Sequence, residues 1–263
     1  MQLKHRVALN GVQMDSLDSR MMVLSVATQA PQENDVTAQR GGNGTRFIRK
    51  QRTGLDVAVQ CAMDIKKDSM DEREELMEAV ASWASSLPGW LTTAQKPGRR
   101  FRAESVKLPA AGDPFEWTNK YTFTFTAHAV PYWQDSEATE MTITAADENV
   151  SSIINPGTEA TVCDASLTNP GSETIDSLTV RIGNSSFIFS GLGLEAGETL
   201  VISHDEEGLL NIRIRSGTTY RTAMDKRTTG SANDLNAGPG SNQILITADE
   251  DMTGTVSLYG RYL

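Results

Sequence analysis

The 263-residue sequence contains few of the residue types that build catalytic and metal sites. Its two cysteines, Cys61 and Cys163, are far apart and lie in apolar-patterned segments, so we predict two buried free thiols. Its three histidines, His5, His128 and His204, are scattered and show no zinc or catalytic-triad spacing. The sequence therefore predicts no catalytic residues and no bound metal.

The sequence also lacks the motifs that bind phosphate-containing cofactors. No Gly-Lys dipeptide is present, which excludes a P-loop. Gly191, Gly193 and Gly197 do not have the spacing of a dinucleotide-binding loop, and no G-x-S-x-G motif occurs. We expect no cofactor and no enzymatic activity, and a hydrolase is the remaining enzymatic alternative.

Long apolar runs and excess positive charge are absent as well. No window approaches the roughly 20 apolar residues of a membrane span, and residues 1–15 lack the apolar run of a secretory signal. Acidic residues outnumber basic residues 34 to 24, a net charge of −10, which disfavours non-specific binding to nucleic acid or acidic membranes. We expect a globular protein made in the cytoplasm, with no membrane partner.

The charge is divided unevenly along the chain. Residues 1–133 carry 17 Lys and Arg against 15 Asp and Glu, whereas residues 134–263 carry 7 against 19. The change coincides with the end of an aromatic segment at Trp133, so we predict two domains, 1–133 and 134–263. One domain with a lopsided surface is the alternative.

The first domain shows strand alternation and one helical pattern. Every second residue is apolar in several segments, which is typical of half-buried strands. These predicted strands are 21–30, 55–65, 99–108 and 120–127. Over about 70–86 an apolar stripe with helical spacing follows the capping-box pair Ser69 and Glu72, and it buries Trp83. We therefore predict a β-rich domain with one α-helix.

The second domain consists of short apolar segments separated by Gly- and Pro-containing turns. This spacing is typical of an antiparallel β-sandwich of the jelly-roll kind. The predicted strands are 139–145, 160–167, 175–182, 185–190, 198–203, 209–215, 243–248 and 254–262. The acidic clusters 205–207 and 249–251 are predicted hairpin tips, with a cation site and a carboxylate pair as alternatives.

Residues 29–52 have the pattern of a long hairpin arm with a glycine-rich tip at 41–44. Cations are concentrated on its return strand in a protein that is otherwise acidic. This favours docking on a neighbouring copy; a plain exposed hairpin and a nucleic-acid contact are the alternatives. The candidate subunit-interface residues are Arg40, Arg46, Phe47, Arg49 and Arg52.

The order of these features resembles the distal tail protein (Dit) family of long-tailed, non-contractile bacteriophages. The resemblance covers nearly the whole chain and is carried by the order of segments, with no sharp signature. The segments are Leu9-Asn10-Gly11, the Gly-rich arm, Ala81-Ser82-Trp83-Ala84, Arg99-Arg100-Phe101-Arg102-Ala103, Val130-Pro131-Tyr132-Trp133, Gly238-Pro239-Gly240-Ser241-Asn242-Gln243-Ile244 and Tyr259-Gly260-Arg261-Tyr262.

The resemblance implies a structural protein of the phage tail tip, assembled in the host cytoplasm. Family members have a β-rich N-terminal domain and a galectin-like C-terminal sandwich, and in some members the last strand returns to the first domain. Six copies form a ring that joins the tail tube protein to the tail hub and to receptor-binding proteins, and DNA passes through without specific binding. The family has no catalytic residues to carry over.

The alternative function is a carbohydrate-binding sandwich that recognises a host surface glycan. Sugars stack on aromatic side chains, and such modules usually carry several of them. Residues 134–263 contain no tryptophan and five other aromatics: Phe187, Phe189, Tyr220, Tyr259 and Tyr262. The composition therefore favours the structural role.

Overall fold

The computed structural model describes residues 6–29, 33–39, 45–64, 70–109 and 120–263. The chain forms two compact units: unit 1 comprises Met1–Trp133 with Leu263, and unit 2 comprises Gln134–Tyr262. Strands dominate both units, their sheets are antiparallel, and one α-helix occurs in the described part of the chain. The predicted fold class is confirmed. No helix among the described residues is long and apolar enough to cross a membrane.

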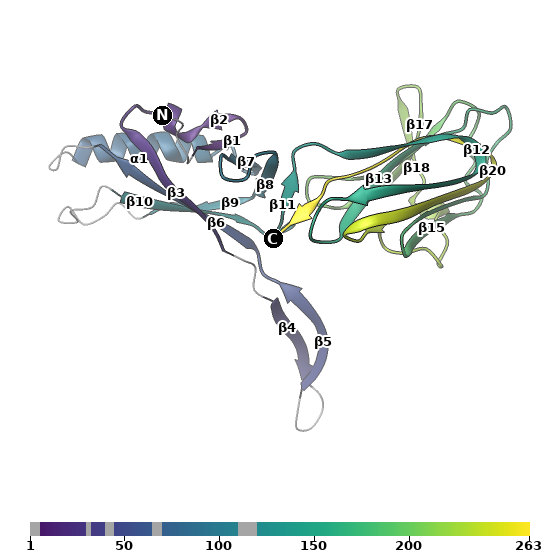
Figure 1. Cartoon of the computed structure of the whole chain (residues 1–263), viewed down its shortest axis with the longest axis horizontal. Helices are drawn as coiled ribbons and strands as arrows, with labels where there is room; N and C mark the ends of the chain where they lie inside the picture. The colour runs from purple at the N-terminus through teal and green to yellow at the C-terminus, as the bar shows by residue number, and fades with distance from the viewer. Residues whose placement is uncertain (1–5, 30–32, 40–44, 65–69, 110–119) are drawn as a thin grey trace. The chain divides into compact units, whose positions relative to one another are not determined.

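A four-stranded antiparallel sheet with the order β3-β6-β10-β9 is the centre of unit 1 (Figure 1). Its strands are β3 (Met21–Gln29), β6 (Leu55–Met63), β10 (Lys120–Ala127) and β9 (Ser105–Lys107). The alternation of β6 is complete, because Leu55, Val57, Val59, Cys61 and Met63 are all buried. Strand geometry turns these residues to one face, and that face forms the core.

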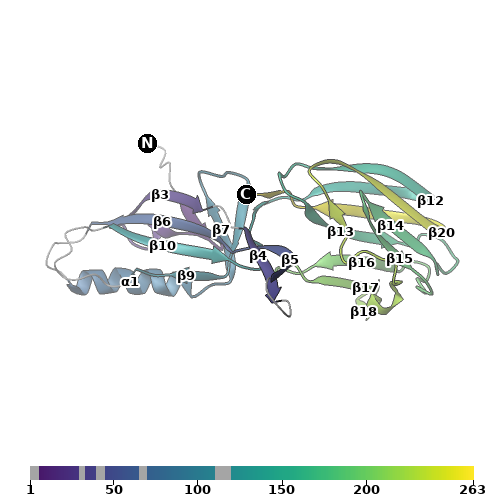
Figure 2. The same cartoon turned by 90° about the horizontal axis from the view of Figure 1, so that it is seen from below.

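Helix α1 (Met70–Ala84) runs along this sheet (Figure 2). Trp83 is buried and meets Phe125 of β10 edge-on, with 5.8 Å between the ring centroids. Its indole Nε1 donates a hydrogen bond to the carbonyl of Val12 at 3.0 Å, so Trp83 joins three segments of the core. The helix ends two residues before the predicted position 86, and the predicted cap Ser69 lies outside the described residues.

A second sheet of unit 1 has the order β2-β1-β7-β8 and continues to Trp133 at the start of β11. The elements are β1 (Val7–Leu9), β2 (Val12–Gln13), the 3-10 turn η1 (Met14–Ser16), β7 (Gly89–Thr93), β8 (Arg99–Ala103) and β11 (Trp133–Asp135). Asn10 and Gly11, both with positive φ, form the two-residue turn between β1 and β2. The side-chain amide of Asn10 also accepts from the backbone N–H of Trp90 and donates to the carbonyl of Ser86.

The prediction of one strand over 99–108 is wrong. The segment is divided between the two sheets of unit 1, because β8 pairs with β7 whereas β9 pairs with β10. Glu104 lies at the crossing; its N–H donates to the carbonyl of Thr126 and its carboxylate accepts from the N–H of Ala129. Both halves have strand character, so the pattern of apolar residues does not reveal the change of sheet.

Strands β4 (Glu33–Gln39) and β5 (Thr45–Arg52) form a separate two-stranded antiparallel sheet (Figure 1). In the sequence this hairpin lies between β3 and β6. Among the described residues, β4 and β5 pair only with each other. The pairing has a register shift between Val36 and Thr37, which is a β-bulge in the arm.

Unit 2 is built around two long strands, β12 (Thr139–Asn155) and β20 (Gly240–Leu258), which pair at both ends and change register on either side of Ala146. The C-terminal half of β20 also pairs with β13, and its N-terminal half pairs with β14. The curled sheet has the order β15-β14-β20-β13-β16-β17-β18, with β12 on β20 and β19 on β13.

The remaining elements of unit 2 are short. They are β13 (Thr161–Thr168), β14 (Leu178–Ile182), β15 (Ser185–Phe189), β16 (Thr199–His204), β17 (Leu210–Ser216), β18 (Thr219–Thr222), the 3-10 turn η2 (Met224–Lys226), β19 (Asn236–Ala237) and β21 (Arg261–Tyr262). One hydrophobic cluster fills the interior and includes Val180 and Ile244 from one half of the sheet and Leu200 and Val256 from the other. This is the core of a β-sandwich.

The prediction of two strands at 243–248 and 254–262, joined by an acidic hairpin tip at 249–251, is wrong. β20 continues through the acidic residues, and β12 extends to Asn155, ten residues beyond its predicted end. Register shifts around Ala146 let the paired strands bend at this point. The exposed acidic side chains are therefore in the middle of a strand, where local charge alone suggested a turn.

Gly254 in β20 occupies a position that no other residue fits. Its φ is +154°, and a Cβ atom at this position would lie 1.9 Å from the carbonyl oxygen of Ser166 on β13. The close approach of β20 and β13 therefore depends on the absence of a side chain. Gly191 differs, because its φ is +60° but a Cβ atom there would meet no other atom within 4 Å, so only its backbone conformation requires glycine.

We predict that Gly254→Ala lowers the free energy of unfolding by about 3 kcal/mol or more, because it forces β20 away from β13. Gly191→Ala is the control and costs about 1–2 kcal/mol, since only its backbone conformation is strained. Denaturant unfolding monitored by circular dichroism measures both. Equal effects of the two substitutions would contradict the close packing of β20 on β13.

The two cysteine thiols are free and fully buried, as predicted. Burial raises the pKa of both Cys61 and Cys163 from 9.0 to about 12, since the thiolate is poorly solvated in the core. The neutral thiols stabilise the fold below about pH 9, where the unfolded thiols are also protonated. That stabilisation decreases as the pH rises from 9 towards 12.

We therefore predict that neither thiol of the native protein reacts with a disulfide reagent at pH 8, and that both react once the chain is unfolded. The measurement is the absorbance of the released aromatic thiolate with and without denaturant. Rapid reaction of one thiol in the native state would show that its segment is open to solvent.

Candidate functional site

The register of the arm separates its cations into two groups. Lys50 and Arg52 of β5 lie opposite Asp35 and Glu33 of β4. Opposite charges at facing positions of an antiparallel pair attract each other and stabilise the hairpin. These two cations therefore have acidic residues facing them within the arm itself.

The other two cations of β5 have no acidic residue opposite them. Arg49 lies opposite Val36, and Arg46 lies opposite Ala38. The bulge changes the phase of β5, which puts both of these positions on the same face of the ladder. Arg46 and Arg49 therefore form the better candidate for contact with another molecule.

The structure thus places four of the five predicted interface residues on β5, and it distinguishes between them. Phe47 lies opposite Thr37, on the same face of the ladder as Arg52. Arg40 lies outside the described residues. The sequence placed these residues in one cationic group, and it contained no sign of the bulge that divides them.

The two edge strands of the central sheet of unit 1 differ in length and in charge. Among the described residues, the edge strands β3 and β9 each pair with one neighbour. β9 has three residues and ends in Lys107, and short charged edges resist pairing with another chain. β3 has nine residues, MMVLSVATQ, with no charge and no proline, and Met22 is 49% exposed. β3 is therefore an unprotected edge that suits the addition of a strand.

Cations and aromatic rings are stacked on the second sheet of unit 1. The Cζ atom of Arg100 lies 4.0 Å from the ring centroid of Trp90, and the Nζ atom of Lys96 lies 4.9 Å from that of Trp133. Burial, and secondarily the charge of Arg99, lowers the pKa of Lys96. These contacts hold the basic segment on its own unit, which favours a structural role for it.

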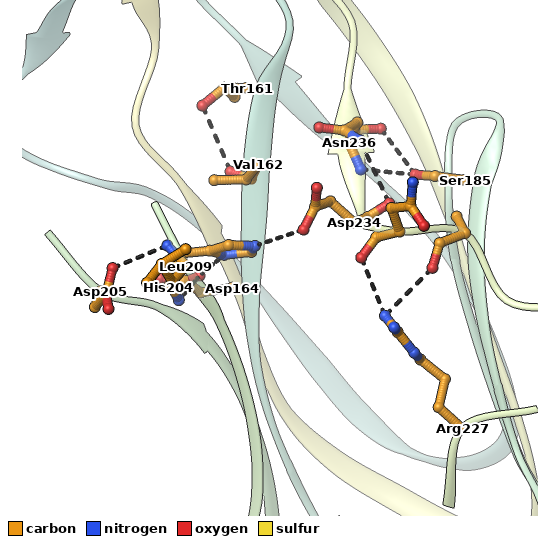
Figure 3. A network of polar contacts seen from close by, with 12 residues as sticks. Thr161, Val162, Asp164, Ser185, His204, Asp205, Leu209, Arg227, Asp234 and Asn236 are labelled. Carbon is orange, nitrogen blue, oxygen red and sulfur yellow. Dashed lines mark hydrogen bonds and ion pairs between the residues drawn. The ribbon is translucent and has the colours of Figure 1, made fainter. Parts of the chain in front are cut away.

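The polar network of Figure 3 is the group of ionisable residues in unit 2 that sequence reasoning missed. The Nδ1 atom of His204 lies 2.8 Å from Oδ1 of Asp164, and its Nε2 lies 3.4 Å from Oδ1 of Asp234. The histidine side chain is 5% exposed. Residues 40 and 30 positions apart in the sequence meet here, so no local pattern could reveal the cluster.

The geometry of this network indicates that it holds segments of the fold together. Each carboxylate meets a different ring nitrogen, so the three groups do not converge on one point where a metal ion or a substrate atom would bind. The network joins β13, β16 and the segment before β19. No group of three or more potential metal ligands was found among the described residues.

Several acidic side chains of unit 2 also make internal hydrogen bonds. The Asp205 carboxylate accepts hydrogen bonds from the backbone N–H groups of Glu207 and Leu209 in its own turn. The Asp249 carboxylate accepts one from the backbone N–H of the distant residue Ser177. Hydrogen bonding to Arg221 lowers the pKa of the largely buried Glu198, against the opposing effect of burial. These contacts give the acidic residues roles in the fold and lend no support to a cation site.

The surface of unit 2 offers little for stacking against a sugar. Tyr220 on β18 is 56% exposed, whereas Phe187, Phe189 and Tyr262 are buried. Arg215 lies opposite Tyr220 in the sheet. One exposed tyrosine beside an arginine is a small platform compared with the aromatic surfaces that hold glycans.

Comparisons with known proteins find similarity in the fold. No family model matches the sequence, and no curated protein matches it. The fold is similar to that in the crystal structure of the Dit protein (gp 19.1) of phage SPP1, described as a paradigm of the hub adsorption apparatus in phages that infect Gram-positive bacteria. The TM-score is 0.66 at 12% identity, over 98% of this chain and 99% of that one.

A chain of the phage P2 baseplate in its activated conformation with calcium aligns with a TM-score of 0.47 at 10% identity, over 97% of both chains. The likeness to the SPP1 protein extends over both units. The fold expected from the order of the sequence features is therefore the fold of this chain.

Proposed function

We propose that this protein is a structural component of a phage tail tip, a distal tail protein whose copies form a hexameric ring. The ring joins the tail tube protein to the tail hub and to a receptor-binding protein, and it leaves a passage for DNA. The observation that carries the proposal is the likeness to the SPP1 Dit protein over nearly the full length of both chains. A non-enzymatic role in the virion follows from it.

The two edges of the central sheet support assembly into a ring. A ring needs a heterologous interface, in which one surface of a copy meets a different surface of the next. The long uncharged edge of β3 and the short charged edge of β9 are such a pair of unlike surfaces. In this proposal the arm also docks on a neighbouring copy, and Arg46 and Arg49, which have no acidic residue opposite them in the hairpin, are the candidate contact positions.

The charge of the protein supports the passage of DNA without tight binding. The whole chain has a net charge of −10, which disfavours binding of phosphate groups, but this charge comes from residues 134–263. Residues 1–133 are nearly neutral, with 17 basic and 15 acidic residues, so only the side chains that line the passage decide how DNA is repelled. The cations of unit 1 that stack on Trp90 and Trp133 are engaged within their own unit.

Glycan recognition by unit 2 stays an alternative prediction, supported by Tyr220 alone.

The first prediction from this proposal is a ring that is visible directly. We expect negative-stain electron microscopy of the purified full-length protein to show particles with six-fold symmetry and a central hole. Light scattering coupled to gel filtration should give the corresponding mass. A protein that stays monomeric at high concentration and binds neither tube nor hub protein would contradict the proposal.

The second prediction concerns the arm. Replacing both Arg46 and Arg49 by alanine should weaken self-association about tenfold, because these cations have no acidic residue opposite them in the hairpin. The effect should decrease with added salt. Sedimentation velocity over a concentration series measures it.

The matched control is the double substitution Lys50→Ala and Arg52→Ala on the same strand. It removes the same charge but from positions that face Asp35 and Glu33, so we expect less than about a threefold change in self-association. Equal losses in both double variants would mean that the arm acts through its total charge. No loss in either would exclude these cations from the interface.

A further inference from the structure

Strand β12 leaves one edge of the sandwich unpaired. Within unit 2, all of whose backbone is described, β12 pairs with β20 and with no other strand. Its C-terminal half, residues 148–155, lies beside the N-terminal half of β20, which is followed in the sheet by β14 and β15. The free edge therefore belongs to a regular antiparallel sheet and exposes unpaired backbone groups.

Residues 149–155 of this edge have none of the usual features that prevent pairing with another chain. The stretch NVSSIIN contains no charge and no proline, in a unit whose net charge is −12 from 7 basic and 19 acidic residues. Val150 and Ile154 are each 61% exposed and lie on the outer face with Ser152 between them. An uncharged edge with exposed β-branched residues is a surface that proteins normally cover.

The sequence of this stretch indicates which partner covers it. If two copies of the stretch pair antiparallel around Ser152, Val150 of each copy faces Ile154 of the other, and the two Ser152 residues face each other. On the inner face, position 151 lies opposite position 153, and position 149 lies opposite position 155; the amides of Asn149 and Asn155 stay bonded within their own copy. Facing apolar β-branched residues stabilise a pair of strands, and no charged residue lies between positions 149 and 155.

Shifting the centre of the self-pairing by one residue in either direction gives less favourable facing pairs. Pairing around Ser151 puts Ile154 opposite the charged Glu148, and pairing around Ile153 puts Val150 opposite Pro156, which has no N–H to donate. The register around Ser152 avoids both problems. Because each residue i meets residue j and j meets i, this is a self-complementary, isologous contact.

We propose that residues 149–155 of β12 are a two-fold self-association site, at which a second copy of this chain adds its own β12 and continues the sheet. The contact closes on two copies, so it is separate from the heterologous interface of a ring. Seven residues on each side form a contact smaller than the roughly 800 Å² per partner of a standard interface. We therefore expect a weak dimer whose fraction depends on concentration.

Cysteine cross-linking of the full-length protein tests the contact and its register. Facing residues of an antiparallel pair have Cα atoms about 4.5–5.5 Å apart, within the range that a disulfide spans. Ser152→Cys should therefore form a disulfide-linked dimer under mild oxidation, seen on a non-reducing gel. The native thiols Cys61 and Cys163 are buried and give no background.

Two single variants make the register test stricter. Val150→Cys and Ile154→Cys should each remain largely uncross-linked alone, because in each the new thiol faces an unchanged residue. Mixing the two proteins should produce the disulfide dimer. Thr142→Cys is the matched control, since it is also exposed on β12 but lies outside the self-paired stretch.

A charge variant tests the contact without covalent chemistry. Ser152→Lys puts two ammonium groups face to face and should raise the dimer dissociation constant at least about tenfold in sedimentation equilibrium. Thr142→Lys should leave it unchanged. Both should leave ring formation and the thermal unfolding midpoint close to those of the unmodified protein.

The results separate this proposal from the proposed function. If no ring is seen but Ser152→Cys forms the disulfide-linked dimer, the β12 contact is supported and the ring proposal is rejected. A ring without any cross-link, together with the same sedimentation behaviour for Ser152→Lys and the unmodified protein, overturns the β12 contact alone. Cross-linking of Val150→Cys by itself as efficiently as Ser152→Cys would overturn the register.

Discussion

The hydrogen-bonding groups at the edges of β-sheets are the constraint on which this structure depends. Every open antiparallel sheet ends in a strand with unpaired N–H and C=O groups, and these must meet water, another strand or a covering segment. The edge strands of this protein differ in length and in charge. β9 is three residues long and ends in Lys107, whereas β3 and the C-terminal half of β12 are long and uncharged over residues 21–29 and 149–155. The unprotected edges account for the tendency to assemble that we propose.

The two unprotected edges suit different kinds of contact. The edge of β3 lies in a sheet whose other edge is unlike it, which suits a repeated head-to-tail interface. Residues 149–155 of β12 match a second copy of themselves, which suits a closed pair. Both proposed contacts would use the same kind of backbone hydrogen bond between edge strands, so the side chains and their register would decide which surface each edge meets.

The alternation of polar and apolar residues predicted much of the fold. β10 has the predicted bounds 120–127, and α1 begins at the predicted residue, because burial of one face leaves a period in the sequence. The periodicity of apolar residues gave wrong strand boundaries where a segment changes its pairing partner without a change in its burial pattern. The segment 99–108 changes sheets at Glu104, and β20 runs through Asp249 to Asp251. In both places the pairing of distant strands decided the outcome.

Composition and local period predict a mainly β chain with two buried cysteines, an acidic second half and the helix that is found among the described residues. The folded structure was needed to show which cations of the arm face acidic residues, which described strands pair with a single neighbour, and that His204 meets Asp164 and Asp234. These features depend on register and on contacts between segments far apart in the chain, and neither leaves a local trace in the order of residues.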